Sequence, residues 1–178
     1  MKLKSFAVLI IVFLFFPKAA AQNMSIGGFI GGGTIAGFSA STGAFTSSLF
    51  AQMDTPFFGF DTRFSFIYAQ DFNKLLPGST NKYFPFIKAV SLKAMFTQPL
   101  SSPFYIEEGF GPIAINDRTF SDVSEWNYGV VFSITPGIDF RKNHSNGFKA
   151  GAGVEYAITF GNTSAQYFSL HLQGQFYF

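Results

Sequence analysis

The sequence predicts an all-β protein, an eight-stranded antiparallel up-and-down transmembrane β-barrel. Apolar and polar residues alternate with a period of two along most of the chain, which is typical of strands rather than helices. Aromatic residues make up 20% of the chain and charged residues only 12%, against about 25% charged residues in soluble domains. So little charge excludes an ordinary solvated surface and an intrinsically disordered chain. No apolar run of about 18 residues follows residue 21, which excludes a helical membrane bundle.

The segment before the first expected strand resembles a secretory signal. Lys2 and Lys4 precede eleven consecutive apolar residues, Phe6–Phe16, a run that is too short to span a bilayer. Ala19–Ala21 then offers small residues to signal peptidase. We therefore expect a cleaved signal peptide at 1–21 and a barrel domain at 22–178. A short membrane anchor is the alternative, and a lipoprotein is excluded because the chain has no cysteine.

Removal of this segment reverses the sign of the net charge. The chain has 12 basic and 10 acidic residues, and Lys2, Lys4 and Lys18 are lost without any acid. The mature chain then has nine basic and ten acidic residues, a formal charge of −1. The apparent basic character therefore gives no support to nucleic-acid binding.

Eight runs of the mature chain are expected to be strands: 24–36, 44–53, 57–70, 84–97, 104–115, 126–140, 147–160 and 166–178. The first contains Gly31-Gly32-Gly33, which we interpret as a flexible or close-packed part of a strand, since no helix follows that could bind phosphate. The second, fourth and fifth runs, like the first, alternate less regularly. The third alternates clearly, with Phe64 and Phe66 on one face and Arg63 and Ser65 on the other.

The last three runs alternate most regularly. In 126–140, aliphatic and aromatic residues such as Phe132 oppose Gly, Ser, Thr and Asp. The run 147–160 sorts in the same way. In the final run one face carries Phe168, Leu170, Leu172, Gly174, Phe176 and Phe178. The other face carries Tyr167, Ser169, His171, Gln173, Gln175 and Tyr177.

The connections alternate in length, as a membrane barrel requires. Turn-forming residues occupy 54–56, 99–103 and 142–147. The longer stretches Asn73–Tyr83 and Asn116–Glu125 fall at the opposite end. Eight strands of about ten residues make the smallest such barrel.

The polar face determines which side of the sheet points outward. A soluble barrel of the lipocalin type also alternates, but it needs Lys and Glu over its exterior. Here the polar face consists mostly of Gly, Ser, Thr, Ala and Gln, which suit a crowded interior. The apolar face is rich in Phe, as lipid contact and aromatic girdles require.

With these features the chain resembles the small outer-membrane barrels of the OmpA/OmpX type, in the sequence-divergent form common in Bacteroidota. Its last strand resembles the C-terminal signal read by the barrel-assembly machinery, with Phe176 and the terminal Phe178 as its aromatic positions. The usual glycine position is Gln173 here, and Gly174 comes one residue later. The resemblance implies location in the outer membrane of a Gram-negative cell, with outer-membrane lipids and the assembly machinery as partners.

The interior of such a barrel is just wide enough for side chains to fill it. Opposite charges there must pair, because an isolated buried ion is very costly. We expect a structural network of inward side chains, with an ion path as the alternative: Asp61, Arg63, Lys93, Glu107, Lys149, Glu155 and His171. Glu107 and its neighbour Glu108 cannot both point inward from a regular strand, so we expect a bulge or an interfacial position for one of them.

The sequence gives little support to an enzyme. Eight-stranded lipid A deacylases use a His-x-Ser-Asn run, whereas His144-Ser145-Asn146 lacks the intervening residue. His171, Ser169 and Glu155 have suitable spacing but face the interior, where no lipid reaches. Two histidines and no cysteine give no transition-metal set. We therefore expect no catalytic residues, no metal and no cofactor.

The expected function is that of a non-enzymatic barrel with a structural or accessory role, as a companion of a larger outer-membrane complex. Its Phe-rich outer face would pack against another outer-membrane protein. The expected external contacts lie in the two longer loops: Leu75, Leu76, Tyr83, Phe120 and Trp126. An adhesin acting through these loops, a lipid A-modifying enzyme and a conducting channel are the alternatives.

Overall fold

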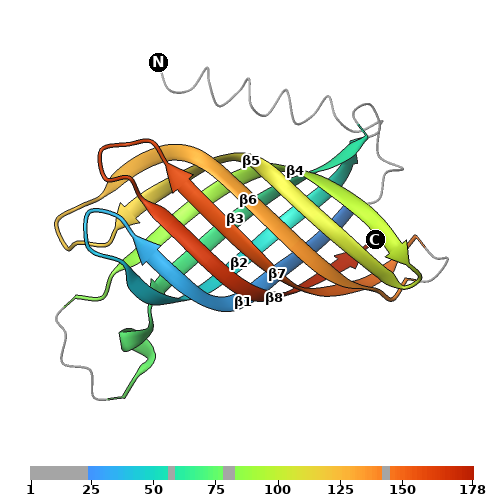
Figure 1. The fold of residues 1–178 in the computed structure, drawn as a ribbon, viewed down its shortest axis with the longest axis horizontal. Coiled ribbons are helices and arrows are strands. Elements are labelled where there is room, and N and C mark those ends of the chain that lie inside the picture. Colours follow the sequence, from blue (N-terminus) through green and yellow to red (C-terminus); the bar gives the residue numbers. More distant parts are fainter. Residues whose placement is uncertain (1–23, 56–58, 78–82, 142–144) are drawn as a thin grey trace.

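The computed structural model describes residues 24–55, 59–77, 83–141 and 145–178. Its strands form one closed barrel in which each strand pairs antiparallel with the next and the last pairs with the first (Figure 1). The strands are β1 (Met24–Ala36), β2 (Thr42–Thr55), β3 (Phe60–Asp71), β4 (Phe86–Ser101), β5 (Phe104–Arg118), β6 (Glu125–Asp139), β7 (Gly147–Thr159) and β8 (Gln166–Tyr177). This topology confirms the predicted fold class. The expected signal peptide, 1–21, lies outside the described residues.

The described ranges contain no helix that is long and apolar enough to cross a membrane.

Two of the expected strand ends are wrong. The expected connection at 98–103 is largely paired strand, because Gln98 and Pro99 continue the ladder opposite Ile106 and Tyr105. The register shifts only between Pro99 and Ser101, and this irregularity accommodates a residue that has no backbone N–H to donate. At the other end of β5, pairing with β4 and β6 continues to Arg118 and Asp117 respectively.

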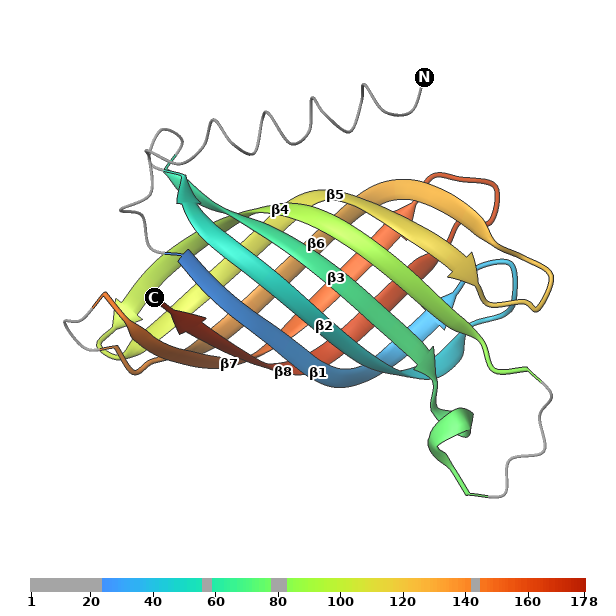
Figure 2. The ribbon, with the colours of Figure 1, turned by 180° about the vertical axis from the view of Figure 1, so that it is seen from behind.

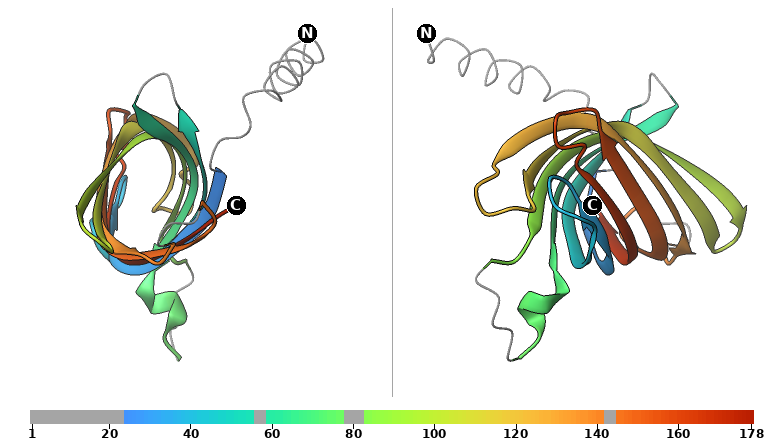
Figure 3. Two further views of the ribbon diagram at one scale, coloured as in Figure 1. Left: turned by 90° about the vertical axis from the view of Figure 1, so that its right-hand side faces the viewer. Right: turned by 60° about the vertical axis from the view of Figure 1, so that its left-hand side comes forward.

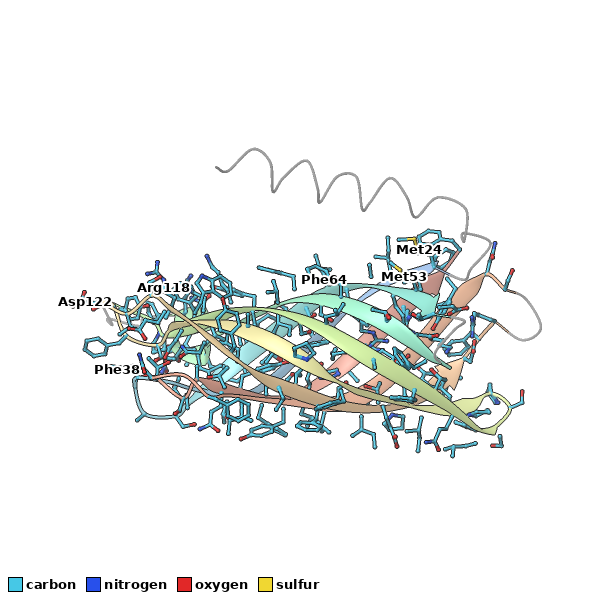
Figure 4. The ribbon with its side chains drawn as sticks, turned by 90° about the horizontal axis from the view of Figure 1, so that it is seen from above. Met24, Phe38, Met53, Phe64, Arg118 and Asp122 are labelled. Carbon is cyan, nitrogen blue, oxygen red and sulfur yellow. The ribbon has the colours of Figure 1, made fainter. Side chains whose placement is uncertain are left out.

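The barrel has two different ends. The connections β1–β2, β3–β4, β5–β6 and β7–β8 lie at one end, called here the loop end. It includes a short 3₁₀ helix, η1 (Phe72–Leu75), which stands away from the barrel (Figure 2). The other connections and both Met24 and Phe178 lie at the turn end. Figure 4 labels Met24 and Met53 at the turn end, and Phe38, Arg118 and Asp122 at the loop end.

Alternate residues of each strand point into and out of the barrel, because successive side chains leave a pleated strand on opposite sides. On β8, Ser169, His171 and Gln173 are buried, whereas Leu170 and Leu172 are exposed. The outer face carries large apolar side chains on every strand. Phe64, for example, projects from the outside of the barrel (Figure 4). The end-on view shows that the strands close into a complete ring (Figure 3).

The interior is divided into two halves. The half near the turn end is polar and charged. The half near the loop end is filled by an apolar cluster of buried side chains: Ile35, Ala44, Ile67, Ala69, Ile87, Ala89, Ile113, Ile115, Val131, Ala157, Ala165 and Tyr167. An apolar layer across the barrel therefore separates the loop end from the half that holds the Arg63–Glu107 and Lys93–Glu155 ion pairs.

The glycines of β1 allow close approach between β1 and β8. A Cβ atom at Gly33 would lie 1.8 Å from the carbonyl oxygen of Phe168, and one at Gly31 would lie 2.1 Å from that of Leu170. Only residues without a side chain fit such contacts. The Gly31-Gly32-Gly33 run is thus a close-packed part of a strand, where the barrel closes.

Candidate functional site

The charged half of the interior is organised around Arg63 of β3. Its guanidinium Nη2 lies 2.5 Å from Oε2 of Glu107 on β5, and both side chains are at most 2% exposed. Arg63 Nε and Nη2 also donate to Oε1 of Gln52, at 2.8 and 2.5 Å. Gln173 of β8 accepts from Arg63 and donates to Glu107. The pair and its amide partners therefore connect β2, β3, β5 and β8 through the interior.

A second buried ion pair lies between Lys93 of β4 and Glu155 of β7. The hydroxyl of Tyr167 on β8 donates to the same Glu155 carboxylate. One carboxylate thus connects three strands, two of which, β4 and β7, are not neighbours in the sheet. Tyr167 is also part of the apolar cluster, so this contact marks the boundary between the two halves.

The third group of charges lies near the turn end. Arg141 Nη2 is 2.8 Å from Oδ2 of Asp139, and Lys149 Nζ is 3.9 Å from the same oxygen. The hydrogen bonds to Asp139 raise the pKa of Arg141. The guanidinium carbon of Arg141 also lies 3.9 Å from the ring centre of Tyr177. Sequence reasoning placed Lys149 in the network but missed Asp139 and Arg141, although Asp139 was expected to face inward.

Two residues of the expected network make no ion pair that the described residues show. Asp61 accepts a hydrogen bond from Nε2 of Gln52 at 2.8 Å. The His171 ring stacks on Phe29 with their centres 4.0 Å apart. His171 therefore lies among the network residues as a packed aromatic group.

The interior contains no assembled catalytic triad among the residues described. Ser169 Oγ lies 3.4 Å from Nδ1 of His171 and 2.6 Å from the hydroxyl of Thr46. The third candidate member, Glu155, is engaged by Lys93 and Tyr167 instead. His144, the alternative candidate, lies outside the described residues.

No group of three or more potential metal-ligating side chains occurs in the described parts of the chain.

The two adjacent glutamates on β5 lie on opposite sides of the barrel wall. Glu107 is fully buried inside, whereas Glu108 is exposed on the outer face. The expected bulge is wrong, because the ladder is regular at this point, whereas the alternative of an interfacial position stays a prediction. Glu108 pairs with Phe96 on one side and with Ile134 on the other, without a register shift.

An aromatic groove crosses the outer face beside Glu108. It has a volume of about 440 Å³ and is lined by side chains of β4 to β8, including Phe96, Phe110, Phe132, Tyr156 and Phe168. The rings of Phe110 and Phe132 are 4.8 Å apart. This groove, called here the Glu108 groove, was not expected from the sequence, since it depends on which strands are adjacent.

No protein-family model matches this sequence, and a search of curated proteins finds no significant match. Solved structures do match. Neisserial surface protein A (NspA) superposes with a TM-score of 0.65 at 10% identity, over 89% of this chain and 98% of that protein. Ail, the attachment invasion locus protein of Yersinia pestis, gives a TM-score of 0.54 at 11% identity, over 88% of this chain and 99% of Ail. The chain has the fold of the small outer-membrane barrels.

In this barrel fold the last strand closes the wall. Phe176 and Phe178 of the expected assembly signal point outward, with ring centres 5.4 Å apart. A Cβ atom at Gly174 would lie 3.1 Å from the ring of Phe148, so this glycine allows the Phe148 side chain to lie flat on the wall. The role of these residues in assembly stays a prediction.

The loop end of the barrel carries exposed apolar side chains. Leu75, Leu76, Phe120 and Trp126 are each at least half exposed. Tyr83 is half-buried, and its hydroxyl donates to the carbonyl of Arg118 at 2.6 Å. Partial burial raises the pKa of Tyr83. Four of the five expected contact residues are therefore available at this surface, and the fifth fixes the β3–β4 connection to β5.

Sequence reasoning missed Phe38, which is 65% exposed and lies 6.1 Å from the ring of Phe120. The carboxylate of Asp117 holds this pair in place. It accepts from the backbone N–H of Phe38 at 2.9 Å and from that of Thr119 at 2.8 Å. Phe38 and Asp117 are 79 residues apart in the sequence, so no local pattern could have indicated this contact.

Proposed function

We propose that this chain is an integral outer-membrane β-barrel and a non-enzymatic companion of another outer-membrane protein. The apolar outer face, the expected signal peptide and the shared fold support this location. Ail, which has this fold, is described as an outer membrane protein and was solved in a phospholipid bilayer nanodisc. That structure matches this chain with a TM-score of 0.50 at 12% identity. In this orientation the turn end faces the periplasm, and the loop end faces the exterior.

The companion role is carried by one observation, the Glu108 groove. Large exposed apolar patches mark contacts with membranes or with other proteins, and a recessed aromatic site gives the side chains of a second protein a shape to pack into. In the described part of the interior, the two most buried carboxylates, Glu107 and Glu155, are engaged in ion pairs, and an apolar cluster fills much of the loop-end half. Glu155, which a Ser-His-Glu enzyme would require, is engaged in an ion pair instead.

The test is isolation of the protein from its native membranes. A tag is inserted within 78–82, and the membranes are solubilised in a mild detergent. Mass spectrometry and the native mass are then measured on the same sample. A stoichiometric outer-membrane partner supports the proposal. A barrel alone in its micelle contradicts it.

A second candidate function is binding through the loop end. It is favoured by the exposed Phe38 and Phe120 rings, which Asp117 fixes at the tip of the barrel. Ail has been solved in complex with the heparin analogue sucrose octasulfate. Replacement of 119–124 by a Gly-Ser loop would abolish surface binding under this candidate and leave a companion complex intact.

A further inference from the structure

Glu108 is a carboxylate in the middle of an apolar surface. Along the outer row of β5 its neighbours are Ile106 and Phe110, and across the ladder they are Phe96 and Ile134. It lies four residues from Phe104, where β5 begins, which is about 10 Å of depth at 3.3 Å per residue and a tilt near 40°. Outward side chains of Ile106 and Phe104 continue the apolar wall from Glu108 toward the turn end. In an outer-membrane barrel this position lies within the apolar wall that faces the hydrocarbon region of the bilayer.

The part of the chain that the structure describes provides no partner for this charge. Among the described residues, Glu108 makes no hydrogen bond or ion pair. The cations on the outer face of the described strands lie elsewhere: Lys88 is two residues from the start of β4, near the ring of Phe86, and Arg118 is at the last position of β5. Both are at the loop end, at the opposite rim of the barrel. An ionisable side chain at membrane depth is costly and indicates a function that uses it.

The Glu108 groove is a recess beside this carboxylate into which a side chain of another protein can fit. Glu108 lies at its edge with Phe96 and Phe110, and Phe132, Ile134 and Tyr156 line the rest. A side chain of another protein that enters this groove would be shielded from lipid by the groove walls. Its cationic end would then meet the Glu108 carboxylate. In such surroundings an ion pair is much stronger than at a wet surface.

We propose that the Glu108 groove is the docking site for a different integral outer-membrane protein, which presents an arginine or lysine from its own lipid-facing wall to Glu108. This inference rests on the proposed companion function and names its interface. A second copy of this chain fits poorly. In a dimer of two parallel copies related by an axis along the membrane normal, the two Glu108 side chains would lie at the same depth. With the groove at the interface, their like charges would repel each other.

The experiment is photocrosslinking in the native cells. A benzoylphenylalanine residue replaces Phe132 in the groove or, as a control, Leu49, which is 72% exposed on β2. We expect Phe132 to crosslink to one outer-membrane protein and Leu49 not to do so. Glu108→Lys should reduce the Phe132 crosslink at least fivefold. Leu49→Lys, which places the same charge on the lipid-facing wall of β2, should leave the Phe132 crosslink unchanged.

The identified partner allows a direct test of charge complementarity. Reversal of its groove-facing Arg or Lys to Glu should restore the crosslink in the Glu108→Lys background. Mobility of the folded barrel before and after heating verifies that each variant is assembled. Variants that do not assemble are replaced by Glu108→Gln, which keeps the size of the side chain and should still weaken the crosslink.

Four results would overturn the inference. A product of two copies of this chain would make the groove a homodimer interface, and a product with lipid alone would make Glu108 a lipid contact. If a partner co-purifies but crosslinks only from Leu49, the companion function is supported, and the Glu108 groove is not the docking site. Absence of any partner in both experiments refutes the function as well.

Discussion

Arg63 and Glu107 form an ion pair that crosses the interior between β3 and β5, two strands that share no ladder. Loss of one partner leaves the other charge buried alone, whereas loss of both removes the two charges together. We expect Arg63→Leu to lower the free energy of unfolding by about 3–5 kcal/mol, and the Arg63→Leu/Glu107→Leu double variant to recover most of that loss. Guanidinium unfolding in lipid vesicles, followed by the fluorescence of Trp126, the one tryptophan, measures both. Equal losses of unfolding free energy in the single and the double variant would show that the two charges are not coupled.

The two neighbouring glutamates of β5 should respond to the same substitution with opposite signs. Glu107→Leu removes the partner of a buried arginine and should destabilise the barrel. Glu108→Leu removes a carboxylate from a lipid-facing wall and should stabilise the isolated barrel, on the order of 1 kcal/mol. The same unfolding experiment in vesicles compares them. Destabilisation by Glu108→Leu in the absence of any partner would place Glu108 outside the hydrocarbon region.

Closure of the barrel depends on the space left by Gly33. Gly33→Ala would place a methyl group against the carbonyl of Phe168 and should slow or prevent assembly of the folded barrel. Gly43→Ala is the matched control on β2, because its Cβ would lie 3.5 Å from the ring of Phe72, an ordinary contact. The folded fraction after refolding, read from heat-dependent gel mobility, should fall for Gly33→Ala alone.

The arrangement of the loop end depends on Asp117. Asp117→Ala removes three hydrogen bonds, to the backbone of Phe38 and to the N–H and hydroxyl of Thr119. We expect faster hydrogen exchange at Phe38 and faster proteolysis of the β5–β6 connection, with little change in the pairing of the strands. Asp122→Ala, which removes an exposed carboxylate bonded only to Ser121 among the described contacts, should change neither. Similar exchange rates in both variants would contradict the role of Asp117.

Much of this architecture could be predicted from alternation alone, because the side-chain period of a strand assigns each residue to one face. Arg63, Lys93, Glu107 and Glu155 were all expected inside for this reason. Which charges meet could not be predicted, since Arg63–Glu107 and Lys93–Glu155 join strands that are not neighbours. Their pairing depends on the tilt and stagger of the whole barrel.

The apolar half of the interior was harder to foresee. Ile67 follows Arg63 and Ser65 on the inward face of β3, but its outward neighbours Phe66 and Tyr68 are apolar as well. Where both faces of a strand are apolar, the polarity of the residues no longer distinguishes the inward face from the outward face. The sequence then does not indicate which side chains fill the interior. The Glu108 groove and the Phe38–Asp117 contact are hidden for a related reason, since they join residues far apart in the chain.

The two ends of the described chain meet at the closing seam, where the backbone N–H of Phe178 donates to the carbonyl of Met24 at 3.0 Å. β8 pairs with β7 along one edge and with β1 along the other. Without β8, β1 and β7 would each keep an unpaired edge, which is prone to aggregate or to join a foreign strand. The first and last strands of the described chain must therefore find each other before either edge is protected, so the wall closes in one long-range step.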